Sequence, residues 1–309
     1  MTGNERYINK LKKNINSFID TGMNNDDISD IINSPLESCE TKRCMYVWEY
    51  HTTAYRTLVL INTWWKLREE NLLDYELNEK MLKAMSIHGD FLMEDCHYEG
   101  EHNHGIIEAS ALYILATNFP NLPNADKWYN TSETRIKSGL NTLIDEDGIL
   151  VENSPYYHFY VMRIYWNLHK YLEKQKNYEL KDCIEYKLNK MISYGTYVLQ
   201  PNIETPLIGA SLRNEVRLKG EFFEIADTNS EFLYILTRGV NGTQPEKLNI
   251  YYPIAGQTII RSGWGKGEDF KHQTQLIFDI GPYRTTHSDL DALSFQLFGK
   301  SIALLPDAG

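Results

Sequence analysis

The hydrophobic periodicity of this chain changes once, near residue 240, and that change limits the folds available to it. From about residue 5 to residue 240, apolar residues recur three or four positions apart, as on one face of an α-helix. From Leu248 onward, short β-rich runs are separated by glycines, as in antiparallel strands. Helices followed by strands indicate two stacked domains rather than an alternating α/β sheet. We therefore predict a helical domain over residues 1–240 and a β-domain over residues 241–309.

Proline and asparagine mark the ends of the longest helical patterns. One pattern covers residues 46–70, and the next begins after Asn103 and stops at the Asn-Phe-Pro sequence of residues 118–120. A third begins at Pro155, because proline is tolerated in the first turn of a helix, and a fourth covers residues 178–199. The predicted strands lie at residues 250–252, 258–261 and 274–279.

The charge of the chain excludes some partners. Its 309 residues include 31 Lys and Arg against 42 Asp and Glu, a formal net charge of −11, which argues against nucleic acid. A heavily sulfated glycan would also be repelled unless a strong local basic patch offset this charge. A polymer with one carboxylate per repeat needs less positive charge in the site. No run of about 18 apolar residues is present in the sequence, so no membrane span is expected. Arginines that could form a basic patch are Arg56, Arg163, Arg213, Arg217 and Arg284.

Three short segments combine groups that bind a carboxylate or move a proton. They are Glu-His-Asn-His-Gly at 101–105, Glu-Asn-Ser-Pro-Tyr-Tyr-His at 152–158, and a segment at 287–295 that begins with His287. An Asn amide donates hydrogen bonds without a competing charge, and a protonated His adds a second donor. Tyr and His transfer protons once their environment adjusts the pKa. A structural interpretation exists as well, because Asn103 could cap the following helix and a Tyr–His pair could pack the inner face of a helix.

Together and in this order, the three segments resemble those of the heparinase II/III-like polysaccharide lyases, and the resemblance covers roughly residues 45–309. These enzymes degrade polysaccharides that contain uronic acids, glycosaminoglycans among them, by β-elimination. The resemblance implies an (α/α) toroid of helical hairpins at 1–240, followed by the beginning of an antiparallel β-sandwich at 241–309, with the active site in the cleft between them. The sandwich is expected to be incomplete, because the sequence stops at Gly309 within a family motif.

β-Elimination requires neutralisation of the uronate carboxylate, a base for the C5 proton and an acid for the departing glycosidic oxygen. The resemblance implies that Asn103, with His104, neutralises the carboxylate. It implies that Tyr157 is the general acid, and also the base if both protons move on one face of the sugar. His287 would be the base for the opposite stereochemistry at C5. Further residues expected to contact the substrate are Glu101, His158, Trp48 and Arg284.

Tyr157 needs a suitable environment for this chemistry, and its partners must come from elsewhere in the chain. A free Tyr has a pKa near about 10, so a positive or donor-rich neighbourhood is required, which His158 or His104 could provide. Asn103 and Tyr157 are far apart in the sequence, so two different helices must present them at one cleft. Glu152 is expected to anchor its loop and to take no part in the chemistry.

Two departures from the family pattern affect the expected site. The family's second histidine, a ligand of a structural metal, is replaced here by Asp289, while Asp307 matches the family's metal-binding Asp. Because Asp can ligate zinc or calcium, a structural divalent metal is one expectation, although the chemistry itself requires no cofactor. Ala210 stands where many members carry an Asp. Residues 293–295, Leu-Ser-Phe, match the family and are expected to form a core strand.

Two other functions stay open from the sequence. A uronyl C5-epimerase uses the same residues but returns the proton, and a non-catalytic carbohydrate-binding relative would account for Asp289 and Ala210. A glycoside hydrolase is disfavoured because no pair of carboxylates stands out. In each remaining case the partner is an anionic polysaccharide or oligosaccharide.

The beginning of the sequence bears on the compartment. Its first residues contain no apolar run that resembles a signal peptide. We therefore expect the protein in the cytoplasm if Met1 is the native start, and otherwise in the periplasm or outside the cell, as in many members of the family that the chain resembles.

Overall fold

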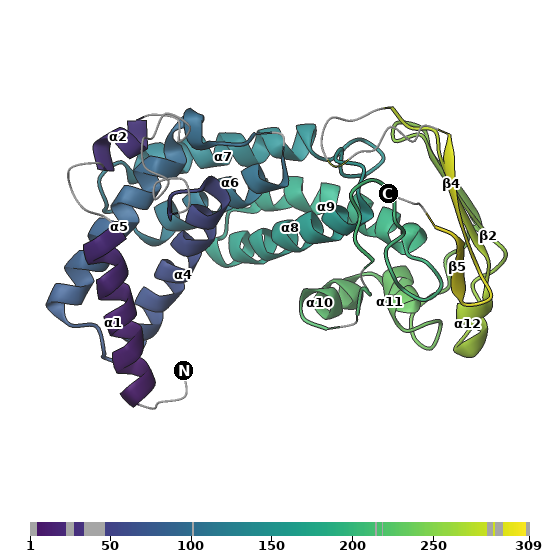
Figure 1. Ribbon diagram of the computed structural model, residues 1–309, viewed down its shortest axis with the longest axis horizontal. Coiled ribbons are helices and arrows are strands. Elements are labelled where there is room, and N and C mark those ends of the chain that lie inside the picture. The colour runs from purple at the N-terminus through teal and green to yellow at the C-terminus, as the bar shows by residue number, and fades with distance from the viewer. Residues whose placement is uncertain are drawn as a thin grey trace. The chain divides into compact units, whose positions relative to one another are not determined.

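The computed structural model of the chain describes residues 5–22, 28–33, 47–100, 102–213, 215–217, 219–282, 287 and 293–306. Helices come first and an antiparallel sheet follows them (Figure 1). The chain divides into two compact units, residues 1–136 and 137–309, and the division falls within helix α7 (Ala125–Thr142). The predicted division at residue 240 stays a prediction. Among the described helices, none is both long enough and apolar enough to cross a membrane.

Figure 1 labels most of the elements in chain order. Those of the first unit are α1 (Glu5–Gly22), α2 (Ile28–Asn33), α4 (Tyr50–Glu69), α5 (Tyr75–Met93), the 3₁₀-helix η2 (Asp95–His97) and α6 (Asn103–Asn118). Those of the second unit are α8 (Pro155–Gln175), α9 (Tyr178–Val198), α10 (Glu221–Thr228), α11 (Ser230–Leu236), β1 (Asn249–Tyr252), β2 (Gln257–Arg261), α12 (Glu268–His272), β3 (Gln275–Asp279), β4 (Ser294–Gly299) and β5 (Ile302–Leu305).

The first unit is built from consecutive helices in contact, since α5 and α6 each pack against α4 and against one another. The helix predicted at 46–70 begins later, at Tyr50, because the Glu49 carboxylate caps it. That carboxylate accepts hydrogen bonds from the backbone N–H groups of His51 and Thr52. Helix α6 has the predicted limits, from Asn103 to Asn118.

In the second unit, α8 and α9 pack against each other as a helical hairpin. Pro155 is the first residue of α8, as predicted, and the Ser154 side chain caps the helix. Lys176 ends α8 in the left-handed conformation, with φ 59°, and Asn177 caps α9 directly after it. Helix α10 packs on α8 and α11 packs on α9.

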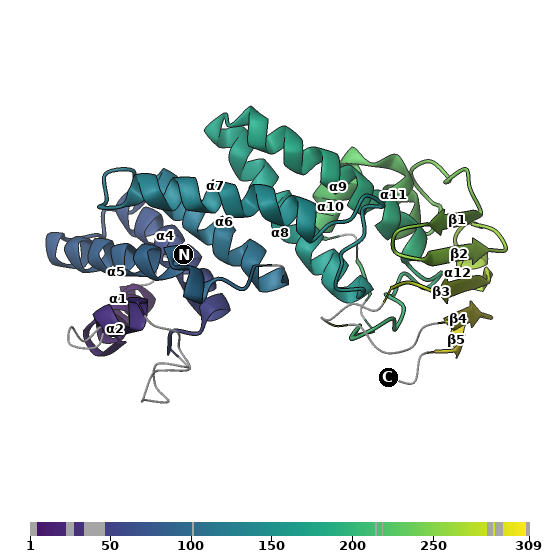
Figure 2. The same ribbon diagram turned by 90° about the horizontal axis from the view of Figure 1, so that it is seen from above.

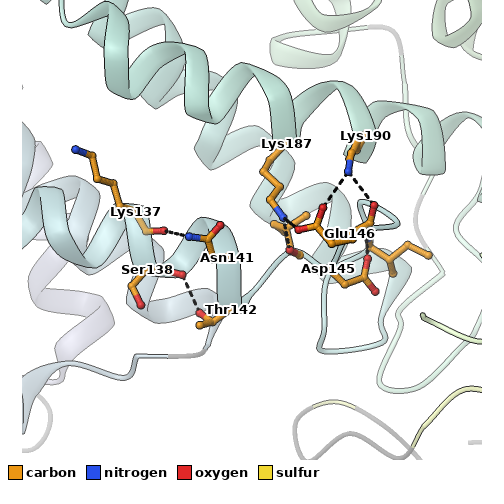
Figure 3. A network of polar contacts seen from close by, with 10 residues as sticks. Lys137, Ser138, Asn141, Thr142, Asp145, Glu146, Lys187 and Lys190 are labelled. Carbon is orange, nitrogen blue, oxygen red and sulfur yellow. Dashed lines mark hydrogen bonds and ion pairs between the residues drawn. The ribbon is translucent and has the colours of Figure 1, made fainter. Parts of the chain in front are cut away.

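A lysine pair on α9 holds the turn that leads into residues 152–154 (Figure 3). The Lys187 ammonium group donates to the Glu146 carboxylate at 2.8 Å and to the carbonyl oxygen of Ile144 at 3.0 Å. The Lys190 ammonium group donates to the carboxylate of Glu146 at 3.1 Å and to its carbonyl oxygen at 3.0 Å. The two ammonium groups thus bind both the backbone and the side chain of the turn at residues 144–146. This turn, from which the chain continues to α8, is therefore attached to α9.

The sheet is an antiparallel meander in which the strands follow the chain order β1-β2-β3-β4-β5 (Figure 2). The register pairs Ile259 with Ile277, and Ile277 with Gln296. Strands β1, β2 and β3 lie where the sequence predicts them, within one residue at each end.

The two faces of the sheet differ in polarity. The face toward the end of α9 buries polar side chains, and two of them bind the last carbonyl groups of that helix. Gln275 donates to the carbonyl oxygens of Tyr197 and Leu199 at 2.9 and 3.1 Å, and Arg261 donates to the same two groups. These bonds satisfy helix-end acceptors that otherwise lack a partner. The buried face of the sheet therefore carries polar side chains beside apolar ones such as Ile259 and Ile277.

The opposite face carries apolar side chains that are partly exposed, among them Ile260 on β2 and Phe295 on β4. Ser294 begins β4, but Phe295 is 50% exposed and Leu293 is 69% exposed. The expectation that residues 293–295 form a core strand is therefore wrong in this respect: a strand forms, but Phe295 lies on the exposed face.

Candidate functional site

Tyr157 and His287 lie against each other in the second unit. Tyr157 stands in the first turn of α8, where its backbone N–H donates to the capping hydroxyl of Ser154. The imidazole ring of His287 is stacked on the phenol ring, with centroids 4.0 Å apart and planes at 12°. The Nε2 atom of His287 lies 3.6 Å from the Glu152 carboxylate, whose side chain is fully buried. A phenol, an imidazole and a carboxylate therefore form one contiguous group.

The turn at residues 209–210 supports His287 from its backbone side. The backbone N–H of Ala210 donates to the carbonyl oxygen of His287 at 2.8 Å. Gly209 has φ +53°, and a Cβ there would overlap that same carbonyl oxygen. The turn is thus formed although Ala210 replaces the Asp that many family members carry.

A buried amide–carboxylate network fixes the residue between Glu152 and Ser154. Asn153 has φ 51°, a left-handed conformation that Asn tolerates better than most residues. Its side chain donates to the Asp279 carboxylate at 3.3 Å and accepts from Gln257 at 2.9 Å. Gln257 also donates to Asp279 at 3.1 Å and accepts from the hydroxyl of Tyr194 at 2.8 Å. The loop with Glu152 is therefore attached to both the sheet and α9.

Sequence reasoning missed Asn153, Gln257 and Asp279 as parts of the site. One signal was available, because Asn153 stands directly between Glu152 and the Ser-Pro helix start, at a point where the chain must turn. Nothing local in the sequence marks Gln257 or Asp279, since polar residues in an antiparallel strand ordinarily face solvent.

The environment of Tyr157 differs from the one expected. Burial raises the pKa of Tyr157, and the negative charge of Glu152 raises it further. His158 does not offset this effect, because it is fully buried and its Nε2 atom lies 3.0 Å from the carbonyl oxygen of Met191 on α9. Burial lowers the pKa of His158 to about 4, so its ring is neutral. Tyr157 is therefore protonated at neutral pH, as a general acid must be.

Asn103 and His104 open helix α6 in the first unit. The cap of this helix is His102, whose Nδ1 atom accepts from the backbone N–H of His104 at 3.2 Å. The structural interpretation of Asn103 as the cap is therefore wrong. Asn103 is 1% exposed within the chain, whereas His104 is partly exposed. Of the two, His104 is the residue that solvent reaches directly.

The imidazole ring of His104 is held on two sides. Its Nδ1 atom contacts the Glu99 carboxylate. Its ring is stacked on that of His51, with centroids 4.1 Å apart and planes at 13°. Burial lowers the pKa of His51, and the neighbouring charge of His104 lowers it further. A neutral His51 stacked on a His104 that is paired with a carboxylate is the arrangement that these charges favour.

Two of the predicted substrate contacts are core residues in this structure. Trp48 is 1% exposed and packs against His88 and Phe91, with ring centroids 5.1 and 5.3 Å away. His158 joins α8 to α9, as described above. Neither side chain presents a surface to a sugar, so the expectation that they bind substrate is corrected here. The expected residues Glu101, Arg284, Asp289 and Asp307 lie outside the described residues.

Some described side chains could in principle surround a metal ion. Glu49, His51 and His104 place their candidate ligand atoms within 4.8 Å of one another, and so do Glu99, His102 and His104. Several of these atoms already have partners within the chain, since Glu49 caps α4 and His102 caps α6. The structural metal expected at Asp289 and Asp307 stays a prediction.

The expectation that Asn103 and Tyr157 meet at one cleft also stays a prediction. Each is described within its own unit, where Asn103 adjoins His104 and the Tyr157 ring is stacked on that of His287.

Solved structures with a similar fold belong to heparinases. A crystal structure of heparinase III matches the whole chain with a TM-score of 0.77 at 21% identity, and the match covers 48% of that protein. A heparan sulfate lyase mutant from Pedobacter heparinus matches the whole chain with a TM-score of 0.72 at 22% identity, over 46% of that protein. The predicted fold class is confirmed: helices of an (α/α) toroid followed by the beginning of an antiparallel β-sandwich.

Sequence comparison identifies the family. The family described as "Heparinase II/III N-terminus" matches residues 1–230, and the chain belongs to it. A heparin-sulfate lyase from Pedobacter heparinus is 25% identical over 222 residues, which cover 69% of this chain and 32% of the relative. One from Bacteroides thetaiotaomicron is 24% identical over 288 residues, which cover 80% of this chain and 40% of the relative. The chain thus spans less than half the length of these relatives.

Proposed function

We propose that this chain carries catalytic residues of a polysaccharide lyase that cleaves a uronic-acid-containing glycan, of the glycosaminoglycan class, by β-elimination. The stacked pair of Tyr157 and His287 carries this proposal, because it places two proton-transferring groups in contact. The names of the relatives, heparin-sulfate lyases, support the same reaction and the same class of substrate.

Neutralisation of the substrate carboxylate is assigned to the start of α6. His104 is partly exposed and paired with Glu99, and when it carries a second proton it offers a positive donor to the carboxylate. The Asn103 amide adds a neutral donor. Donors of this kind stabilise the negative charge that develops on the carboxylate when the C5 proton leaves, and thereby make that proton acidic enough to remove.

Proton transfer is assigned to the start of α8 and to His287. The base takes the C5 proton, the C5–H electron pair forms the C4–C5 double bond, and the C4–O bond breaks with its electrons on the glycosidic oxygen. Tyr157, protonated at neutral pH because burial and Glu152 raise its pKa, gives that oxygen a proton. His287, beside the Glu152 carboxylate, accepts the C5 proton as the base. The products are a new chain end and a C4–C5 unsaturated uronate.

The charge of the chain favours a substrate of low sulfation. The formal net charge is −11. Three of the arginines that could form a basic patch are paired with carboxylates: Arg163 with Glu221 at 3.2 Å, Arg213 with Glu204 at 3.9 Å and Arg217 with Glu215 at 2.6 Å. A fourth, Arg56, donates to His88 and to the Val47 carbonyl oxygen. These pairings reduce the positive charge available to sulfate groups.

The ultraviolet absorbance of the unsaturated uronate tests the proposal. We would incubate the protein with an unsulfated uronate polymer, with heparan sulfate and with heparin, and compare Tyr157→Phe with the matched control Tyr156→Phe. Absorbance that rises with the less sulfated polymers, vanishes in Tyr157→Phe and persists in Tyr156→Phe is the expected result. If the folded protein produces no absorbance with any of the polymers, the proposed lyase function is wrong. Incorporation of solvent deuterium at C5 would then identify an epimerase.

A further inference from the structure

Glu108 is a buried carboxylic acid one helical turn after His104 on α6. Its side chain is fully buried, and its Oε2 atom accepts a hydrogen bond from the backbone N–H of Glu99 at 3.0 Å. Its Oε1 atom has no hydrogen-bond partner among the described residues. Burying a carboxyl group that has a single hydrogen bond costs folding free energy. That bond is therefore a candidate for a role in the site.

The bond fixes a two-residue segment on the first turn of α6. Gly100 follows Glu99 with φ +50°, and the segment lies so close to the helix that a Cβ on Gly105 would overlap the Gly100 carbonyl oxygen. Glu108 and Gly105 therefore act on the same segment from different points of the helix. One supplies an acceptor for its backbone, and the other supplies the space that it occupies.

The side chain of the segment reaches the candidate site. The Glu99 carboxylate contacts the Nδ1 atom of His104 and lies 3.8 Å from the Nδ1 atom of His102. When Nδ1–H of His104 donates to Glu99, the Nε2 atom is the ring nitrogen left for a substrate. The orientation of the His104 ring thus depends on where the backbone places Glu99.

We propose that Glu108 is a positioning residue: through the backbone of Glu99 it holds the Glu99 carboxylate against His104 and so orients the imidazole that neutralises the substrate carboxylate. The role of His104 in this statement rests on the lyase function proposed above. Burial raises the pKa of Glu108 to about 8, so this carboxyl group is mostly neutral and does not place a second negative charge beside Glu99.

Two variants separate the acceptor from the acid. Glu108→Gln keeps an acceptor oxygen for the Glu99 N–H. Glu108→Leu keeps roughly the side-chain volume but removes the acceptor oxygen. Gly105→Ala displaces the same segment from the other contact point. Ser110→Ala is the matched control, because Ser110 is buried on the same helix and its hydroxyl donates to the carbonyl oxygen of Ile106, within the helix itself.

The first measurement is the ring nitrogen NMR spectrum of His104, which needs no substrate. We expect its signals to move in Glu108→Leu and Gly105→Ala, in the direction in which Glu99→Ala moves them, and to stay in place in Glu108→Gln and Ser110→Ala. The second is lyase kinetics well below the melting temperature of each variant. We expect kcat to fall about 10²-fold in Glu108→Leu, with KM little changed, and to be largely retained in Glu108→Gln.

Unmoved His104 signals in Glu108→Leu would overturn the positioning role, whatever the kinetics. Equal losses of kcat in Glu108→Leu and Ser110→Ala would also overturn it, because they would reduce Glu108 to a packing residue. If the parent protein has no lyase activity, the proposed function fails by that result alone, and the His104 spectra still decide whether Glu108 orients the ring.

Discussion

The imidazole ring of His287 lies parallel to the phenol ring of Tyr157, with their centroids 4.0 Å apart, and its Nε2 atom faces a fully buried carboxylate on Glu152. The two rings come from positions 130 residues apart in the chain (287 − 157). Local sequence pattern cannot bring them together. The turn at Gly209 and Ala210 does so by holding the His287 backbone.

His287→Phe separates proton transfer by the His287 imidazole from the stacking of its ring on Tyr157. Phe keeps a ring against Tyr157 but cannot carry a proton, so we expect kcat to fall about 10²- to 10⁴-fold while the melting temperature stays close to that of the parent. His287→Ala loses the ring contact as well and should lower both. Retained turnover in His287→Phe would exclude His287 as the base.

Gly209→Ala should destabilise the second unit. The left-handed φ of +53° disfavours Ala, and the new Cβ would overlap the His287 carbonyl oxygen, so we expect a loss of about 1–3 kcal/mol in the free energy of unfolding and a large loss of turnover. Gly220→Ala is the matched control, since Gly220 has φ +55° and nothing within 4 Å of a Cβ. Urea unfolding compares the two, and equal losses would show that backbone conformation alone accounts for the effect.

Asp279→Asn should weaken the network around Asn153. The Asp279 carboxylate accepts from Asn153, from Gln257 and from the backbone N–H of Gly281. An amide cannot accept all three bonds, because one oxygen becomes an NH₂ group that faces a donor. We expect a cost of about 1–3 kcal/mol in the free energy of unfolding. Asp182→Asn, at an exposed position on α9, removes a charge without such a network and should leave stability nearly unchanged.

The sequence predicts the limits of α6 and α9 and the start of α8 because short-range signals set them. Pro155 fits the first turn of a helix, and Asn-Phe-Pro at residues 118–120 ends one. The burial of side chains at those helix starts depends on contacts far along the chain. For that reason His158, a core residue in contact with α9, was expected to face the substrate.

The polarity of the sheet could not be predicted for a related reason. An alternating strand has two faces, and the pattern alone does not say which one is covered. Polar residues on the covered face of this sheet bind the carbonyl groups at the end of α9, so Gln275 is buried while Phe295, on the other face, is half exposed. Asp279 was missed as part of the site because its partners Asn153 and Gln257 come from two other segments.

Acid should destabilise the protein through two buried histidines. Burial lowers the pKa of His88 to about 3 and that of His158 to about 4, each from 6.5. In the unfolded chain each ring takes up a proton as the pH falls below about 6.5, whereas in the native state it stays neutral until about pH 3–4, so the unfolded state binds more protons in this range. The contribution of these two histidines to stability is thus complete above about pH 6.5 and is lost as the pH is lowered, by about 3 kcal/mol for His158 by about pH 4. His158→Gln, whose amide can still donate to the Met191 carbonyl oxygen, should remove that share of the slope in urea unfolding measured from about pH 7 to pH 4. A slope unchanged from that of the parent would show that His158 is already protonated in the native state.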